Sequence, residues 1–424
     1  MGVNKNIRKT KLSNGLVVVS ETIPHVRSIS FGVFLRTGSR HETPERNGIS
    51  HFIEHALFKG TRKRSTAQIA EESDALGGHL DAFTGKEIVG FHDKVIDEHM
   101  PRAFELMADL ITAPAFDRTE LDKERNVILE EIRMVEDMPD DLVFEIFAEN
   151  YYPDHALGRP ILGTPETLAT FAPPRVRAHY QSTFAPANLV LAAAGNITHA
   201  KLVAMARKYF GHLRPGGKIP PATTPRPRPH VTLRHKKELE QTHLVLGCAC
   251  PSITGADRYT AYLLSAILGG GMSSRLFQSV REEHGLVYTV FSMTSSYVDC
   301  GQFNIYAAAS RDNLQKTLAE IMDQLRRIKA EPVSAAELQR NKDQLKASLI
   351  LNLESSSSRM HALAQQEIQY GRFIPLDDVV RHVDEVSAEN ILRLANDIFL
   401  PDQLALAMIG NLRGVRLRQQ DLQC

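Results

Sequence analysis

Two histidines and a glutamate lie within five residues of one another in the stretch HFIEHALFKG, which begins at His51. His51 and His55 are spaced i and i+4, so in a helix both imidazoles face one side and can bind a single zinc ion. Glu54 points to the same place without having to bind the metal, as a general base must. The alternative interpretation is a solvated polar face on a core helix, and the motif alone leaves it open.

The apolar residues around this motif predict the helix that must carry it. They follow the i, i+3, i+4, i+7, i+8 pattern of a core stripe and comprise Ile49, Phe52, Ile53, Ala56 and Leu57. Asn47 and Ser50 are suitable caps for its start, and Gly60 is suitable for its end. The pattern therefore predicts a helix over residues 48–59, with His51, Glu54 and His55 opposite the stripe.

A second predicted helix, TELDKERNVILEEIRMVEDMPDD, offers a third metal ligand. Glu124 and Glu131 are seven residues apart and border its apolar stripe, whereas Glu130 is turned about 100° away, toward solvent. A buried carboxylate without a partner is costly, and a bound metal would remove that cost. The alternative is that each of the two glutamates pairs with a lysine or an arginine.

HFIEH followed by Glu131, 76 positions after His55, resembles the inverted zinc motif HxxEH…E of the pitrilysin-type metallopeptidases, particularly their mitochondrial-processing-peptidase-like bacterial branch. The similar segments LSNGL, GGHLDAFTGKE, ERNVILEEI and LGGGMSSRLFQSVREEHGLVYTV extend the resemblance over nearly the whole chain. The resemblance implies one zinc ion per chain, bound by His51, His55 and Glu131. It also implies that Glu54 is the catalytic base, that Glu124 supports the ligands, and that the reaction is peptide-bond hydrolysis.

The same resemblance implies that the segment LDAFTG is the sheet edge to which a substrate peptide adds as a further strand, through the main chain of Ala82, Phe83 and Thr84. The family usually has asparagine where this chain has Asp81. This departure puts hydrogen bonding to the substrate in doubt, because an ionised aspartate accepts hydrogen bonds but cannot donate one to a peptide carbonyl.

Four further residues match substrate-binding positions of the family. Arg281 and Tyr288 match an arginine and a tyrosine that bind near the scissile bond, where both can stabilise an oxyanion. Without the family, they are an exposed helix residue and a half-buried strand residue. Asp141 and Glu145 match acidic positions that hold an arginine near the cut, and their i, i+4 spacing puts both on one helical face. The alternative for this pair is a solvated helix start, where acidic residues are favoured by the helix dipole.

The chain contains an internal repeat. In STFAPANLVLAAAGNI and NDIFLPDQLALAMIGNL, eleven positions separate Phe184 and Phe399 from the glycine of a Gly-Asn turn. APAFDRTELDKERNVILEEI and AEPVSAAELQRNKDQLKASLI align at an offset of 217. Two matches indicate duplicated halves, although two similar β-α units by chance are the alternative. In the second half Ser348 replaces Glu131 and MSSRLF replaces the histidine segment, so only the first half should bind metal.

The predicted fold class is therefore α+β, with two homologous α/β-roll halves, each a mainly antiparallel sheet packed against helices. Residues 1–214 form the expected catalytic zinc-binding half, residues 215–230 a proline-rich linker, and residues 231–424 a substrate-binding half that lacks the zinc motif. The family resemblance implies that the halves face each other as a clamshell around the substrate.

Composition excludes several other functions. The chain has 424 residues with 50 Lys+Arg against 50 Asp+Glu, so no net charge attracts nucleic acid or an anionic membrane. Its four cysteines show no CxxC spacing, which argues against a disulfide framework and indicates a reducing compartment. No apolar stretch approaches the ~20 residues of a membrane span, and no leader is seen, so a bacterial cytoplasmic protein is expected. No glycine fingerprint supports a nucleotide enzyme or an oxidoreductase.

The expected partners are peptide substrates and, by the resemblance, a second copy of the chain in a homodimer. The rival hypothesis is a non-catalytic peptide-binding or assembly subunit of the same fold. The presence of all four residues His51, Glu54, His55 and Glu131 argues against that rival.

Overall fold

The structure is a computed structural model that describes residues 6–217 and 219–424, and it contains two compact units. Each unit is assembled from three separate stretches of the chain. Unit 1 comprises Met1–Arg133, Pro160–Thr223 and Ile350–Pro375, and unit 2 comprises Met134–Arg159, Thr224–Leu349 and Leu376–Cys424.

Unit 1 is built on a six-stranded sheet with the order β1-β2-β6-β3-β5-β4. The strands are β1 (Ile7–Lys11), β2 (Val17–Thr22), β3 (Ser28–Leu35), β4 (Asp81–Thr84), β5 (Val89–Ile96) and β6 (Leu189–Gly195). Neighbouring strands are antiparallel except for β2 and β6. The sequence of β6, LVLAAAG, is apolar throughout because both faces of this central strand are buried.

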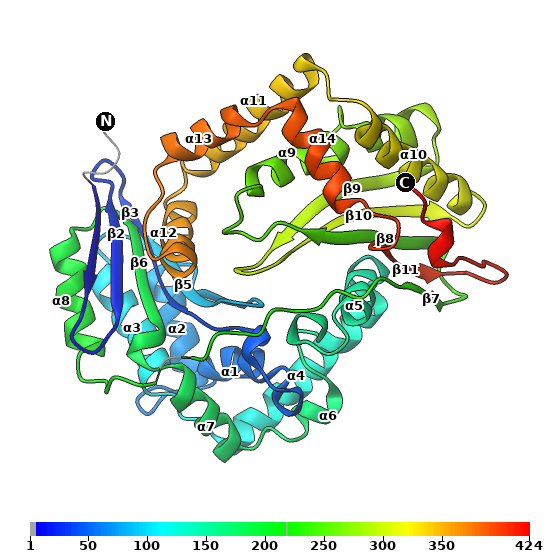
Figure 1. The fold of residues 1–424 in the computed structure, drawn as a ribbon. Helices are drawn as coiled ribbons and strands as arrows, with labels where there is room; N and C mark the ends of the chain where they lie inside the picture. Colours follow the sequence, from blue (N-terminus) through cyan, green and yellow to red (C-terminus); the bar gives the residue numbers. More distant parts are fainter. Residues whose placement is uncertain (1–5, 218) are drawn as a thin grey trace. The chain divides into compact units, whose positions relative to one another are not determined.

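Helices cover both faces of this sheet (Figure 1). They are α1 (Ile49–Leu57), α2 (Thr66–Leu76), α3 (Met100–Thr112), α4 (Arg118–Asp137), α6 (Pro165–Leu168), α7 (Pro173–Thr183), α8 (His199–Phe210) and α12 (Ser356–Tyr370). Phe31 and Val33 of β3 belong to the core shared with α1 and α3, whereas Phe34 belongs to the core on the opposite face, with Met360 and Leu363 of α12. The period-two alternation of a strand thus fills two separate cores.

Unit 2 is built on a five-stranded sheet with the order β7-β11-β8-β10-β9. Its strands are β7 (Val231–His235), β8 (Gln241–Cys250), β9 (Val287–Ser296), β10 (Gly301–Ser310) and β11 (Ala405–Gly410). Its helices are α5 (Pro139–Tyr151), α9 (Arg258–Gly269), α10 (Leu314–Ala330), α11 (Ala335–Asn352), α13 (Leu376–Glu385) and α14 (Ala388–Ile398), with a π-helix at Phe277–Glu283. The helix α5 packs on one face of the sheet, where Val143 and Phe147 contact the core that contains Val245 and Ala407.

The two sheets have the same topology. The order β2-β6-β3-β5-β4 is repeated as β7-β11-β8-β10-β9, and in each sheet the first two strands of that series form the parallel pair. The helices α5 and α12, which begin at Pro139 and Ser356, cover equivalent faces and start 217 residues apart, as in the sequence repeat. The prediction of duplicated α+β halves is therefore confirmed.

The compact units are not simple halves of the chain. The helix α5 belongs to the first half of the sequence but packs on the sheet of unit 2, and α12 belongs to the second half but packs on the sheet of unit 1. The reason is that each sheet has a second apolar face, which this exchanged helix covers. The unit boundary at Thr223 and Thr224 falls within the predicted linker at 215–230.

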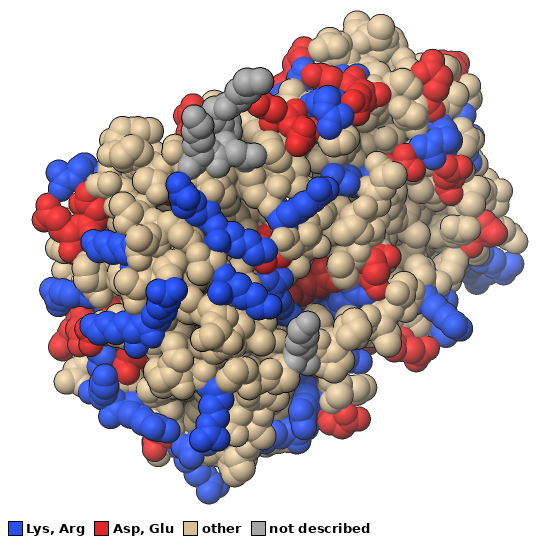
Figure 2. All heavy atoms as spheres, turned by 60° about the vertical axis from the view of Figure 1, so that its left-hand side comes forward, with Lys and Arg blue, Asp and Glu red and all other residues tan. Residues whose placement is uncertain are grey.

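The edge strand β1 is charged along its exposed side. Arg8, Lys9 and Lys11 are all exposed, and Lys and Arg side chains are numerous on the side of the molecule shown in Figure 2. Lysine and arginine at a sheet edge discourage pairing with another chain. Among the described residues, no helix is long and apolar enough to cross a membrane.

Candidate metal centre

The helix α1 is buried on nearly every side. The exposed fraction is 7% for His51 and 9% for Glu54, while His55 is half-buried. The interpretation of this side of α1 as a solvated polar face is therefore wrong. Burial of two polar side chains beside an apolar stripe is costly unless they have partners.

The start of α1 is held by a residue that the sequence did not single out. The carboxylate of Glu42 accepts hydrogen bonds from the backbone N–H groups of Gly48 and Ser50, both at 2.8 Å. The predicted capping roles of Asn47 and Ser50 are wrong, because the Asn47 side chain instead donates to the carbonyl of Pro160. A carboxylate is suited to this place because it accepts hydrogen bonds from the free N–H groups of the first turn. Its negative charge is also stabilised by the positive end of the helix dipole.

The helix α4 presents the two predicted carboxylates. Glu124 is buried, Glu131 is half-buried, and Glu130 is exposed and pairs with Arg133, as the helical pattern predicted. Glu124 contacts both His55, at 2.8 Å from Nδ1, and Lys59, at 2.8 Å from Nζ. Glu124 thus takes part in the histidine cluster and in an ordinary ion pair at the same time.

Three potential ligand atoms converge beside α1. The Nε2 atoms of His51 and His55 lie 3.6 and 3.8 Å from the same carboxylate oxygen of Glu131. Bonds of ~2.0–2.1 Å in a tetrahedral zinc shell place ligand atoms about 3.4 Å apart, so the observed spacing fits one ion. Glu54 lies in the same cluster, since ligand atoms of His51, Glu54 and His55 are all within 4.8 Å of one another.

The surroundings of the two histidines shift their pKa values in opposite directions. Burial lowers the pKa of His51 to about 3, so its ring is neutral near pH 7 and keeps a lone pair for a metal. Burial also opposes the charged form of His55, but the hydrogen bond to Glu124 and the nearby carboxylates outweigh it and raise the pKa. In the neutral form of His55 that donates through Nδ1 to Glu124, the Nε2 atom keeps its lone pair, and it is this atom that lies near Glu131. Two imidazoles and one carboxylate are a common donor set of zinc hydrolases.

Glu54 is held by a hydrogen bond from the edge strand. The hydroxyl of Thr84 donates to the carboxylate of Glu54 at 2.5 Å. Burial raises the pKa of Glu54 above its usual value, and the Thr84 hydrogen bond and His55 partly offset this effect. A carboxylate fixed in position, with a raised pKa, is suited to accept a proton and return it later.

The strand β4 lies at the edge of its sheet and pairs only with β5 among the described strands. The hydrogen bond from Gly85 N–H to the carbonyl of Ile88 fixes the alternation, so the main chain of Phe83 points toward β5 and that of Ala82 and Thr84 points outward. A substrate strand would therefore bond to Ala82 and Thr84 and not, as the resemblance implied, to Phe83.

Asp81 occupies one of these outward donors. Its carboxylate accepts the Ala82 N–H at 2.8 Å, within the edge strand itself. A peptide that adds to β4 must displace this carboxylate to reach the Ala82 donor. An asparagine oxygen could accept the same hydrogen bond, so the expected effect of Asp81 on hydrogen bonding to the substrate stays a prediction.

The other predicted substrate residues lie in unit 2. The Arg281 guanidinium stacks over the Tyr288 ring at 4.7 Å, and Tyr288 is 74% exposed. Asp141 is exposed and Glu145 is half-buried, one turn apart on α5. The structure brings each pair together within its unit, and their roles stay predictions.

Three contributing residues were missed from the sequence. Lys59 follows His55 by four positions, and both side chains contact Glu124. In the helix predicted over residues 48–59, this spacing puts the two side chains on one face, so the sequence could have indicated Lys59. The side chain of Thr84 was overlooked because only its main chain was considered. Glu42 has no sequence signal, because its contact with the start of α1 depends on the path of an irregular segment.

The donor set is of the kind that zinc hydrolases use, and the proteins similar to this chain show its family. The description "Insulinase (Peptidase family M16)" matches residues 17–165, and "Peptidase M16 inactive domain" matches residues 170–345. The chain is 41% identical to the "Uncharacterized zinc protease YmxG" of Bacillus subtilis, over 95% of this chain and 98% of that protein. It is 39% identical to the "Uncharacterized zinc protease SCO5738" of Streptomyces coelicolor, over 96% and 90%. This chain belongs to peptidase family M16.

Solved structures agree with this assignment. A protease from Helicobacter pylori superposes with a TM-score of 0.87 at 25% identity, covering 95% of this chain and 99% of that one. A Pseudomonas fluorescens structure, described as a peptidase M16 inactive domain, superposes with a TM-score of 0.89 at 20% identity, covering 96% and 98%, and supports the fold alone.

Proposed function

We propose that this chain is a zinc-dependent endopeptidase that hydrolyses peptides or unfolded polypeptide segments. The observation that carries the proposal is the convergence of His51, His55 and Glu131 on one point, with Glu54 beside them. These three residues would hold one zinc ion per chain. When bound, zinc lowers the pKa of a water molecule to about 7 and polarises the scissile carbonyl.

Glu54 moves the protons in this proposal. Its carboxylate takes a proton from the attacking water and later gives it to the departing amine. Burial supports the second step because it favours the protonated form of Glu54. The Thr84 hydroxyl keeps the carboxylate in place during both steps.

The edge strand β4 aligns the substrate. An extended peptide adds beside it through the outward main-chain groups of Ala82 and Thr84. Thr84 would then link substrate and base, since its main chain faces the peptide while its side chain holds Glu54. This arrangement places a peptide bond near the base without help from side-chain specificity.

The family resemblance supports extending the proposal to residues of unit 2. Arg281 and Tyr288 would stabilise the oxyanion in an enclosed chamber, and their mutual stacking gives them a common orientation. Asp141 and Glu145 would favour a basic residue near the cut. A homodimer is part of the same proposal and is tested by light scattering on the purified chain.

The test combines metal analysis with peptide turnover. The purified wild-type chain should contain one zinc ion, and Glu54→Gln should keep the zinc while turnover falls by about a hundredfold or more. Glu130→Gln, exposed on α4, is the matched control and should behave as the wild type. Absence of zinc, or full activity of Glu54→Gln, would favour a non-catalytic peptide-binding or assembly subunit instead.

A further inference from the structure

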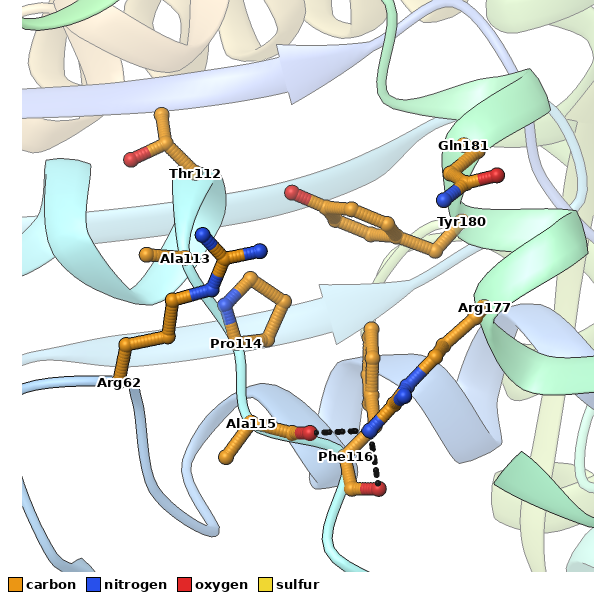
Figure 3. Close-up of a pocket in the computed structure, with 9 residues that line it drawn as sticks. All are labelled: Arg62, Thr112, Ala113, Pro114, Ala115, Phe116, Arg177, Tyr180 and Gln181. Carbon is orange, nitrogen blue, oxygen red and sulfur yellow. Dashed lines mark hydrogen bonds between the residues drawn. The ribbon is translucent and has the colours of Figure 1, made fainter. Parts of the chain in front are cut away.

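A pocket with a volume of about 280 Å³ lies in unit 1, outside the histidine cluster. Its walls come from the segment that follows α1, the segment between α3 and α4, and α7. In Figure 3, Arg62 enters from one side and Arg177 from the other, with Pro114, Phe116 and Tyr180 between them. The pocket is smaller than most drug-sized sites, which begin near about 300 Å³, and therefore suits a small ligand.

The charge of this pocket is not balanced. Both Arg62 and Arg177 line it, and none of the described residues that line it is acidic. The Arg62 guanidinium has no hydrogen-bond or ion-pair partner in residues 6–217 and 219–424, where only its backbone N–H is bonded, to Ala113. Two arginines directed into one small pocket without a carboxylate attract an anion.

Arg177 is fixed before any ligand arrives. Its Nη2 donates to the carbonyls of Ala115 at 2.8 Å and Phe116 at 3.3 Å. Phe116 has a φ of 46°, the one positive value at a non-glycine residue in the described part of the chain. Arg177 thus holds an unfavourable turn, and the part of its guanidinium not used there is preorganised for a ligand.

Apart from Thr112 and Gln181, the rest of the lining is mainly apolar. The Phe116 and Tyr180 rings pack edge to face at 5.3 Å, and Pro114 lies beside them. The Tyr180 hydroxyl is already used, because it donates to the carbonyl of Ile111 at 2.6 Å. The pocket therefore offers cations at its sides and an aromatic surface between them.

We propose that this pocket binds a carboxylate attached to a short apolar body, such as a small organic acid or the carboxyl end of a short peptide. Arg62 is the principal ligand of the carboxylate, Arg177 the second, and the Phe116 and Tyr180 rings contact the apolar body. The site does not depend on peptidase activity.

The pocket lies between the end of α1, which carries His51, Glu54 and His55, and the start of α4, which carries Glu131. Ala115 N–H donates to the carbonyl of Gly60, and Arg62 N–H donates to the carbonyl of Ala113, both at 3.0 Å. These bonds tie the segment after α1 to the segment before α4. A bound carboxylate would bridge Arg62 and Arg177 across the same joint.

The test is a calorimetric titration of the full chain with 3-phenylpropionate, and with 3-phenylpropionamide as the uncharged probe. The carboxylate should bind and the amide should not. Arg62→Gln should weaken binding by about tenfold or more, as loss of a charge-assisted pair requires, and Arg62→Lys by less. Lys63→Gln, a neighbouring exposed residue outside the pocket, is the matched control and should bind as the wild type.

Three results would overturn the proposal. They are no carboxylate binding, equal binding of the amide, or unchanged binding by Arg62→Gln. The last result would place the ligand elsewhere, for example at the histidine cluster. Peptide turnover by Arg62→Gln is measured in parallel. Because turnover tests the peptidase proposal and calorimetry tests the pocket, failure of one proposal can be distinguished from failure of the other.

Discussion

The helices α1 and α9 hold equivalent places in the two halves but bury different chemistry. Each is the first α-helix after an equivalent strand, β3 or β8, and each packs near the edge strand, β4 or β9. The helix α1 buries His51 and Glu54, whereas the buried residues of α9 include no histidine or acidic residue. The expectation that the segment MSSRLF replaces the histidine segment is therefore wrong, because α9 takes that place in the topology.

The helices α4 and α11 show the same difference. At the offset of 217, Asn341 stands for Glu124 and Ser348 for Glu131. Asn341 is buried like Glu124, but it satisfies itself by donating to the carbonyl of Glu337. The fold thus forms without buried carboxylates. Under the proposed function, these carboxylates of the first half serve a metal, which would offset part of the cost of their burial, and the second half has no such ligands.

The largest expected effect comes from removing the carboxylate on α4 that α11 lacks. Glu131→Gln removes the negative ligand, so zinc should be lost and peptide turnover should fall by about a thousandfold or more. Ser348→Ala, the equivalent change on α11, should leave both unchanged. Metal content and turnover of the two variants are compared, and equal losses in both would show that the halves share the site.

Glu124→Gln should have a smaller effect. The amide can no longer act as the ionised acceptor that orients His55 and neutralises Lys59, so zinc affinity should fall by about ten- to a hundredfold. The measurement is competition with a chelator of known affinity. Asn341→Ala is the matched control on α11, and an equal loss of affinity there would contradict a specific role for Glu124.

Glu54→Gln should stabilise the metal-free chain. The pKa of Glu54 is raised by burial, so the carboxyl favours folding below its unfolded pKa, and this contribution is lost as the pH rises through the folded pKa. Above the folded pKa the wild type buries an ionised group, and there the variant should gain free energy of unfolding on the order of 1 kcal/mol. Urea unfolding with a chelator present measures the gain, which should shrink toward pH 4. A gain that is independent of pH would show that the burial of the ionised Glu54 carboxylate is not its cause.

Much of the site could be predicted because it depends on local helical geometry. The spacing of His51 and His55, and the difference between Glu130 and Glu131, follow from 3.6 residues per turn. The burial of the whole helix α1 could not be predicted this way, because a polar face looks the same in sequence whether solvent or another helix covers it.

The exchange of α5 and α12 could not be predicted for a related reason. Periodicity identifies the apolar face of α5, with Val143 and Phe147, but it does not say which sheet that face covers. The choice between sheets depends on contacts with residues such as Val245 and Ala407, which are distant in sequence. The internal repeat predicted the duplicated fold. Because the two sheets are similar, the repeat could not indicate which sheet α5 or α12 packs on.

The smallest expected effect concerns α5 and α12. At the offset of 217, Ser358 and Ala362 of α12 stand for Asp141 and Glu145 of α5, so only α5 carries the acidic pair. If this pair binds a basic side chain, Asp141→Ala with Glu145→Ala should lower the rate for arginine-containing peptides relative to arginine-free ones by about three- to tenfold. Competition between two matched peptides in one reaction measures the ratio directly. Ser358→Ala on α12 is the control, and an unchanged ratio in the double variant would leave the acidic pair as a favourable helix start on a solvated surface.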